Sequence, residues 1–192
     1  MTQRLFVAVV PPPAVRAALD EFLEPRRVAG PELRWMLPEA WHLTCAFMGD
    51  VPDDALDDLG AALVDVAARM APFGITVAGA GAFPNPDAAR VLWLGVAEGA
   101  DELGRLAVRC RNAAAGCGIE VDGGRFRAHV TVARANGLRV LRWLDVLETV
   151  QPQSWRATGF TLIRSQLRAG GAGYQVVGEH PFGRDGVQAV DL

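Results

Sequence analysis

The sequence predicts an α+β fold of two lobes, in which two mainly antiparallel sheets line a central cleft and helices lie outside. Short apolar runs rich in β-branched residues alternate with amphipathic segments of helical period. The order of these segments recurs along the chain, and an identical polar frame marks one strand in each copy. A chain of 192 residues suffices for one sizeable domain, so we expect residues 1–192 to form one domain of two intertwined lobes.

The first copy of the repeat occupies the first half of the chain. Apolar runs predict strands, and apolar residues that recur every three or four positions predict helices. Pro11-Pro12-Pro13 favour a helix start, and Asp53 is the predicted N-cap of a second helix. The predicted elements are a strand at 4–10, a helix at 15–23, a short strand at 33–36, a strand at 41–48, a helix at 53–70 and a strand at 75–83.

The second copy follows the same order. Asp101 is the predicted N-cap of its first helix, which Gly116 and Gly118 close. The ambiguous stretch at 138–150 favours a short helix. The other predicted elements are a strand at 91–96, a strand at 128–133, and two strands at 159–167 and 174–179 that a flexible turn at 170–173 joins.

One four-residue frame occurs in both copies, as His42-Leu43-Thr44-Cys45 and as His129-Val130-Thr131-Val132. Each frame lies in an apolar run that is typical of a buried strand. Because side chains alternate along a strand, the histidine and the threonine of one frame point to the same face. Two such strands placed together bring two imidazoles and two hydroxyls into one cleft. The repeat of the frame and of the element order predicts that a pseudo-two-fold axis relates the two lobes.

These four groups suit acid–base chemistry at a phosphoryl centre. Imidazole has an unperturbed pKa of about 6.5, so one ring can donate a proton while the other accepts one. Hydroxyls can bind the charged oxygens, which leaves no need for a metal or a nucleophilic side chain. No Asp, Glu or Cys lies beside either histidine on its strand face, so we expect no metal and no cofactor. A lone histidine in an apolar strand is usually a core residue, but the repeated frame favours function.

The composition limits the partners and the compartment. The net charge of −3 argues against a long duplex-binding surface but allows a small phosphate site, and all 19 basic residues are arginine. No apolar stretch reaches the roughly 18 residues that span a bilayer, and the N-terminus lacks the pattern of a signal peptide. Three scattered cysteines match neither a disulfide framework nor a zinc site. We expect a cytoplasmic monomer without membrane contact.

Three residues near the frames have two open interpretations. Strict alternation points Arg134 away from His129, but a bulge or turn would let it reach phosphate, so it is either a phosphate contact or a solvated strand end. Trp35 and Phe47 flank the first frame and are either core residues or platforms for a base. Alternation places Phe47 on the face opposite His42, which favours the core.

The residues of this chain resemble the 2H phosphoesterases, which are named for two His-x-Thr/Ser-x motifs. The most similar branch is that of the RNA 2′,3′-cyclic phosphodiesterases, also called LigT-like or 2′-5′ RNA ligase-like. Ala128 stands where that family usually has proline, and Cys45 where leucine is usual. The similarity covers nearly the whole chain and is carried by residues 4–8, 34–50, 83–84, 90–96, 126–134, 165–167 and 173–174.

The resemblance implies an enzyme that hydrolyses 2′,3′-cyclic phosphate ends of RNA to 2′-phosphate ends, and reversible 2′-5′ ligation is reported for the family. It implies that His42 donates a proton to the leaving 3′ oxygen and that His129 accepts one from water. Thr44 and Thr131 would hold the phosphate oxygens, and Arg134 is a further candidate for phosphate binding. Two alternatives stay open: a cyclic phosphodiesterase for a small nucleotide such as ADP-ribose 1″,2″-cyclic phosphate, and a non-catalytic module that binds nucleotide ends.

Overall fold

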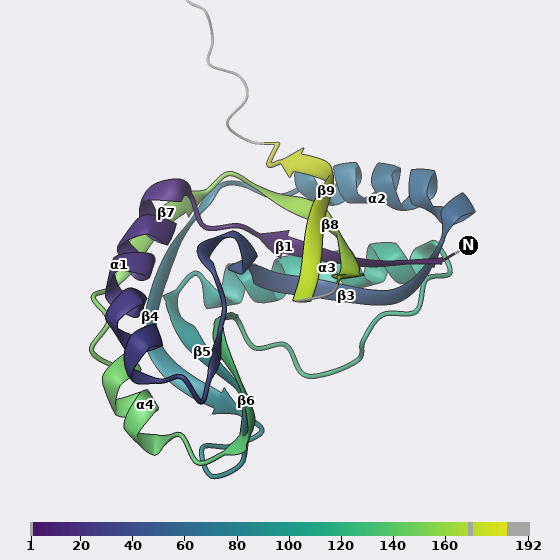
Figure 1. Cartoon of the computed structure of the whole chain (residues 1–192). Helices are drawn as coiled ribbons and strands as arrows, with labels where there is room; N and C mark the ends of the chain where they lie inside the picture. The colour runs from purple at the N-terminus through teal and green to yellow at the C-terminus, as the bar shows by residue number, and fades with distance from the viewer. Residues whose placement is uncertain (1, 169–170, 184–192) are drawn as a thin grey trace, which may run out of the picture.

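A computed structural model describes residues 2–168 and 171–183, and within them nine strands form one sheet (Figure 1). The strand order is β7-β4-β5-β6-β3-β1-β8-β9, with β2 paired to β6. The strands are β1 (Thr2–Val9), β2 (Arg34–Trp35), β3 (Leu43–Pro52), β4 (Phe73–Phe83), β5 (Ala89–Glu98), β6 (His129–Leu138), β7 (Gln153–Ala157), β8 (Gly159–Arg168) and β9 (Gly171–Pro181). The helices are α1 (Pro13–Ala29), α2 (Leu56–Ala68), α3 (Ala100–Gly116) and α4 (Leu141–Leu147), with short 3-10 helices η1 (Pro38–Ala40) and η2 (Asp53–Ala55).

The sheet has two halves that meet at its centre. One half contains β7, β4, β5 and β6, and the other contains β3, β1, β8 and β9. The strand pairs are antiparallel. Across the boundary, β3 and β6 are joined in the described chain by the single pair of Leu43 and Val130. The predicted α+β fold is confirmed, and this short contact joins the two predicted sheets into one curled sheet.

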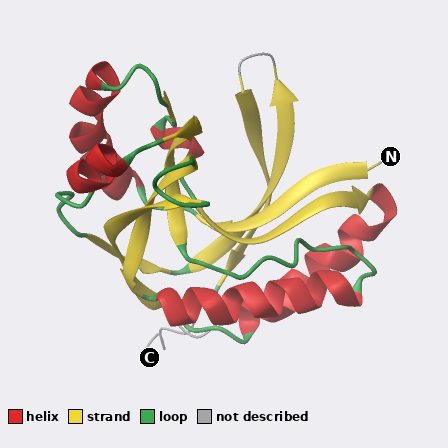
Figure 2. Cartoon of the chain, turned by 90° about the horizontal axis from the view of Figure 1, so that it is seen from below, coloured by secondary structure: helices red, strands yellow, loops and turns green. Residues whose placement is uncertain are grey.

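The helices lie outside the sheet in two groups, α1 with α4 and α2 with α3 (Figures 1 and 2). Helix α1 follows β1 and leads to β2, and it packs against β7, in the half to which β1 does not belong. Helix α3 connects β5 to β6 but packs against β3, again in the other half. Each of these two helices therefore packs against a strand of the half to which the strand preceding it does not belong.

Two apolar clusters stabilise the fold, and they differ in size. The large one fills the space between the sheet and the helices and includes the fully buried residues Leu19, Leu63, Leu92 and Leu106. Burying one such side chain contributes about 1.5–3 kcal/mol. The small one consists of Phe6, Ala8 and Ile163, with Phe47 and Tyr174 packed against it. Because Ala8 and Phe6 alternate with core residues of β1, this small cluster lies on the other face of the sheet, away from the helices.

The predicted elements are present, but several bounds differ and one strand was not predicted. Helix α1 continues to Ala29, beyond the predicted end near residue 23, and contains Pro25. Strand β7 lacks a clear apolar alternation and was not predicted; it forms by pairing with β4. In the predicted turn at 170–173, residue 170 lies outside the described residues, and β9 begins at residue 171.

The two predicted N-caps are wrong. Asp53 begins η2, and α2 begins only at Leu56. The N-cap of α3 is Gly99, with a φ of 86°, and Asp101 lies in the first turn. A Cβ at residue 99 would collide with the carbonyl oxygen of Gly74, so the backbone conformation and the close approach both favour glycine. Among the described helices, none is both long enough and apolar enough to cross a membrane.

Candidate active site

The two histidine frames meet at the centre of the sheet. Leu43 and Val130, the second residues of the two frames, are direct partners in the antiparallel pair of β3 and β6. The sequence predicted that each frame lies on a strand, but it could not predict that the two strands are neighbours. The tertiary structure therefore places both frames in one register, with their polar residues on one face of the sheet.

This register arranges four polar side chains as the corners of a quadrilateral. Continuing the register by one residue on each side of the Leu43 pair places His42 across from Thr131 and Thr44 across from His129. Side chains directly opposite in a sheet have Cβ atoms about 4.5–5.5 Å apart, and diagonal neighbours are about 7–8 Å apart. The two imidazoles thus occupy one diagonal and the two hydroxyls the other.

The fourth residue of the first frame is a β-bulge. Ala8 pairs with Thr44, but Val7 pairs with Ala46, so Cys45 is an extra residue on β3. The same irregularity occurs in the second frame, since Trp93 pairs with Thr131. A bulge inserts one residue on one strand and thereby changes which later residues face which side.

The second bulge has the same place in its frame. Leu92 of β5 pairs with Ala133, whereas Trp93 pairs with Thr131, so Val132 is the extra residue on β6. Both frames therefore end in a bulged residue. This equivalence extends the pseudo-two-fold relation from the motif to the backbone.

Because of the bulges, two residues that follow the frames lie on the opposite face of the sheet from the one that strict alternation predicts. Phe47 pairs with Phe6, which shares a face with Ala8, so Phe47 lies on the His42 face. The expectation that Phe47 faces away from His42 is wrong, because alternation was counted without the bulge. Arg134 pairs with Val91, which shares a face with Trp93. Arg134 therefore lies on the face of His129. The two residues are an odd number of positions apart, so they can share a face only because a bulge lies between them.

Both histidines are held by the same backbone contact. Nδ1 of His42 lies 2.8 Å from the carbonyl oxygen of Ala40, and Nδ1 of His129 lies 2.7 Å from that of Arg127. A carbonyl oxygen can only accept, so Nδ1 carries the hydrogen and donates it in each ring. In the neutral imidazole the lone pair then resides on Nε2, which makes Nε2 the nitrogen available for proton transfer.

Aromatic rings flank each imidazole and fix its orientation. Two rings from β1 and β9 contact one histidine, and two rings from β4 and β5 contact the other. The two rings from β9 and β4 meet their histidines edge-on, an arrangement that aromatic pairs favour, and the other two are tilted. The contacts, measured between ring centroids, join His42 to Phe6 (4.7 Å) and Tyr174 (5.4 Å), and His129 to Phe83 (5.1 Å) and Trp93 (6.0 Å).

Burial lowers the pKa of both histidines. The pKa of His42 falls to about 4, mainly because burial disfavours the cation; the hydrogen bond to Ala40 opposes this effect, and the charges of His129 and Arg134 add to it. Burial also lowers the pKa of His129, with a smaller contribution from the charge of Arg127. Without a ligand, both rings are therefore neutral at pH 7. The effect of the His129 charge on the pKa of His42 agrees with their positions on one diagonal.

The two threonines are half-buried, and in the described part of the chain neither hydroxyl has a hydrogen-bond partner. Arg134 is exposed and pairs across the strands with Arg34, so both guanidinium groups lie on the same face. Like charges directly opposite each other are unfavourable. Within residues 2–168 and 171–183, neither arginine has a carboxylate partner. This face therefore offers free donors and uncompensated positive charge.

Trp35 does not belong to this face, so its interpretation as a platform for a base is wrong. Its ring packs edge-on against Trp143 at 5.4 Å, and its Nε1–H donates to the carbonyl oxygen of Gly30 at 2.9 Å. His180 lies apart from both frames and stacks on Phe160 at 4.9 Å. Among the described residues, no three His, Cys, Asp or Glu side chains gather as a set of metal ligands.

Sequence reasoning missed five residues of the site: Phe6, Tyr174, Phe83, Trp93 and Arg34. Phe6, Phe83 and Trp93 lie in predicted strands, so their presence in the sheet was expected, but their place beside the frames depends on the pairing of β1 with β3 and of β5 with β6 and β4. Tyr174 reaches His42 through the pairing of β9 with β8 and of β8 with β1. Arg34 is placed by its pairing with Arg134. Two features of the sequence could have indicated Arg34, namely its positive charge and its place directly before Trp35.

Solved structures share this architecture at appreciable sequence identity. TT0787 of Thermus thermophilus aligns with a TM-score of 0.75 and 30% identity over 94% of this chain and 98% of that chain. Escherichia coli LigT complexed with 3′-AMP aligns with a TM-score of 0.74 and 27% identity over 95% and 99% of the two chains. LigT has also been solved in complex with ATP, NADP⁺ and phosphate.

Curated relatives named RNA 2′,3′-cyclic phosphodiesterase match the chain over most of its length. The protein from Thermus thermophilus is 35% identical over 96% of this chain and 95% of its own length. The one from Methanothermobacter thermautotrophicus is 31% identical over 91% and 96%. A longer protein from Geobacillus stearothermophilus is 35% identical, and the match spans 41% of its length. The model of the 2′-5′ RNA ligase superfamily matches residues 11–169, and the chain therefore belongs to that superfamily.

Proposed function

We propose that this protein hydrolyses 2′,3′-cyclic phosphodiester ends of RNA to 2′-phosphate ends by metal-independent catalysis with two histidines. The observation that carries the proposal is the pairing of Leu43 with Val130, whose register sets His42 and His129 on one diagonal, each with Nε2 available. In-line displacement at phosphorus needs an acid and a base on opposite sides of the reacting atom. Relatives named for this activity support the choice of substrate.

In the proposed step the cyclic phosphate lies over the quadrilateral. Nε2 of His129 takes a proton from water as the water oxygen attacks phosphorus. The bond between phosphorus and the 3′ oxygen breaks, and His42 protonates the departing oxygen. The hydroxyls of Thr44 and Thr131 donate to the non-bridging oxygens, where charge develops. The product carries a 2′-phosphate and a free 3′-hydroxyl, and a 5′-hydroxyl in place of water would give 2′-5′ ligation.

The acid role requires a protonated His42, although its pKa is about 4 without substrate. An anionic phosphate next to the ring favours the cation and raises the pKa, because an opposite charge within about 4–6 Å stabilises the charged form. Substrate binding would therefore favour protonation of His42, the general acid. His129, as the base, must be neutral when water attacks.

Charge and aromatic surface support a nucleotide end as the substrate. We propose that Arg134, with Arg34 opposite, contacts phosphate, since an anion between two facing guanidinium groups removes their repulsion. Tyr174, edge-on to His42, and Phe47, which packs against the small cluster on the same face, offer rings on which the terminal base can stack. Both histidines come from one chain, so the proposal needs no second subunit, and we expect a cytoplasmic monomer.

The test is incubation with a short RNA that ends in a 2′,3′-cyclic phosphate, followed by identification of the hydroxyl that keeps the phosphate. We expect a 2′-phosphate product, undiminished by EDTA, and none from the control variant His129→Ala. A 3′-phosphate product, or loss of activity to EDTA that a divalent ion restores, would contradict the mechanism. A 2′,3′-cyclic mononucleotide and ADP-ribose 1″,2″-cyclic phosphate, assayed in parallel, separate RNA from small-nucleotide substrates.

A further inference from the structure

The carbonyl groups that hold the two histidines are themselves supported differently. In the first frame the carbonyl belongs to Ala40, at the end of η1. The N–H of the same peptide group, that of Trp41, donates to the carbonyl oxygen of Pro38 at 3.3 Å. The Trp41 side chain is fully buried in the large apolar cluster. Backbone and side chain therefore both hold this peptide group in place.

The second frame lacks both supports. Its carbonyl belongs to Arg127, in a stretch at 119–128 that forms neither helix nor strand. The N–H of the same peptide group belongs to Ala128 and has no hydrogen-bond partner within the described residues. Alanine also leaves the backbone at this point more freedom than a proline would. The orientation of the Arg127 carbonyl therefore depends on another contact.

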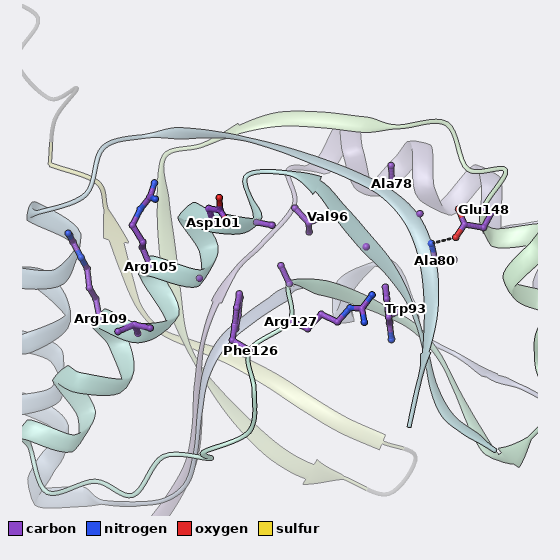
Figure 3. A pocket seen from close by; sticks show the side chains of 16 residues that line it. Ala78, Ala80, Trp93, Val96, Asp101, Arg105, Arg109, Phe126, Arg127 and Glu148 are labelled. Atoms are coloured by element: carbon purple, nitrogen blue, oxygen red, sulfur yellow. Dashed lines mark hydrogen bonds between the residues drawn. The ribbon is translucent and has the colours of Figure 1, made fainter. Parts of the chain in front are cut away.

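The Arg127 side chain supplies such a contact. Its guanidinium lies 4.4 Å from the ring centroid of Trp93, and Figure 3 shows the side chain extending toward that ring. Both residues line a cavity of about 990 Å³. A cation within about 6 Å of an aromatic face is attracted to it, and tryptophan is the best partner. In the described part of the chain Arg127 makes no ion pair that would draw it elsewhere.

The indole of Trp93 is a fixed platform for this stack. Trp93 is 4% exposed and pairs with Thr131, on the face of the sheet that carries His129. The indole lies over Gly81, where a Cβ would collide with the ring. It also contacts Phe83 at 5.3 Å and His129 at 6.0 Å, measured between ring centroids. A guanidinium that stacks on this ring is thus anchored to the strand next to His129.

Arg127 affects the protonation of His129 in two opposed ways. Burial is the main reason that the pKa of His129 lies below its usual value; the Arg127 charge adds to this effect, and the hydrogen bond to the Arg127 carbonyl opposes it. Which ring nitrogen carries the hydrogen in the neutral form depends mainly on the hydrogen bond that the ring makes. The tautomer of His129 is therefore the property that reports the position of the carbonyl separately from the charge.

We propose that Arg127 is a positioning residue: its side chain, stacked on Trp93, fixes the carbonyl group that keeps the hydrogen of His129 on Nδ1. The inference rests on the proposed function, in which His129 accepts the proton of water at Nε2. If the carbonyl turns away, the hydrogen can move to Nε2, and the ring then has no lone pair there to accept that proton. Only molecules with the hydrogen on Nδ1 are competent, so kcat falls with their fraction while substrate binding does not.

The first measurement is the nitrogen NMR spectrum of the imidazoles at neutral pH without substrate, which reports the tautomer of each ring. The chain has three histidines, and His42 is the internal control because η1 holds its carbonyl. In Arg127→Ala we expect both tautomers of His129 but hydrogen only on Nδ1 of His42. Arg125→Ala is the matched control, since Arg125 is an exposed arginine of the same segment that stacks on no ring in the described chain. It should leave both rings unchanged.

The second measurement is the kinetics on an RNA with a 2′,3′-cyclic end. We expect Arg127→Ala to lower kcat about two- to fivefold with KM nearly unchanged, which is the range that the stack of an exposed cation can account for. Ala128→Pro restricts the same stretch of backbone, so in the Arg127→Ala background it should restore kcat and the Nδ1 tautomer. In Trp93→Leu the stack is already lost, so Arg127→Ala should have no further effect there.

Hydrogen that stays on Nδ1 of His129 in Arg127→Ala would overturn the inference. A higher KM with an unchanged tautomer and an unchanged kcat would also overturn it and would make Arg127 a direct contact of the RNA. The spectra need no substrate, so they test the positioning role separately from the reaction. Failure of the unaltered protein to open the cyclic end would reject the proposed function, whereas the spectra would still decide whether Arg127 sets the tautomer of His129.

Discussion

Nδ1 of His42 and Nδ1 of His129 each donate to the carbonyl oxygen of the residue two positions earlier, at 2.8 and 2.7 Å. The two contacts are equivalent under the pseudo-two-fold relation, and they leave the same nitrogen of each ring available. Because both imidazoles make the same hydrogen bond, their different proposed roles must come from the residues that surround each ring. His42 has Arg134 and Phe6 nearby, whereas His129 has Arg127 and Trp93 nearby.

Replacing either histidine should remove most of the activity. His42→Ala and His129→Ala each delete one proton-transfer group, and one such group contributes roughly 10²–10⁴-fold to the rate. The double variant should be little worse than either single one, because the two groups act in the same step. The measurement is kcat/KM on an RNA with a cyclic end, with circular dichroism to verify the fold. Near-normal activity of either single variant would show that the frame is structural.

The threonines should matter less than the histidines. Thr44→Val and Thr131→Val keep the shape of the side chain and remove one hydrogen bond to phosphate, so we expect losses of about ten- to a hundredfold in kcat/KM. Thr44→Ser and Thr131→Ser keep the hydroxyl and should retain most activity. Equal losses in the valine and serine variants would indicate that packing, and not the hydroxyl, is responsible.

A bound anion should raise the pKa of His42 from its low value of about 4. The cationic ring gains an opposite charge, and by reciprocity the anion binds more tightly as the pH falls. Sulfate keeps its charge over this range, so it is a suitable probe. NMR titration of the imidazole signals with and without sulfate measures the shift, and His180, which lies apart from both frames against Phe160, is the internal reference. Sulfate binding that leaves His42 unchanged would place the anion elsewhere.

The protein should lose stability as the pH falls from about 6.5 towards 4. Burial lowers the pKa of His42, His129 and His180 in the folded state, so the unfolded chain binds protons first. Stability therefore rises with pH through this window and is fully present above about 6.5, the pKa of an unfolded histidine. Urea midpoints at pH 7.5 and pH 5 measure the effect. His180→Phe should show a smaller difference, and equal midpoints in the unaltered protein would contradict the prediction.

Arg134 should act on substrate binding more than on chemistry. Arg134→Gln removes a charge from the face of His129, so we expect a KM about tenfold higher with kcat changed less, and a weaker dependence of KM on salt. Arg139→Gln, which alters an exposed arginine outside the site, is the control. If Arg134→Gln leaves KM and its salt dependence unchanged, Arg134 is a solvated strand end.

The sequence by itself determined the α+β class, the position of most strands and the polar pairs of the two frames. Alternation is a local property of an extended backbone, so residues two apart share a face whatever the rest of the chain does. His42 with Thr44, and His129 with Thr131, could therefore be predicted. The N-caps Asp53 and Asp101 could not, because a close backbone approach at Gly99 and a preceding 3-10 turn decided where the helices begin.

Only the tertiary structure decided how the two frames meet. The pairing of Leu43 with Val130 and the bulges at Cys45 and Val132 depend on hydrogen bonds to strands far away in the sequence. Those bulges place Phe47 and Arg134 on the histidine face, where local alternation alone predicts the reverse. That residues 1–192 act as one domain stays a prediction. Partner strands set register and bulges, and no pattern within a single strand records them.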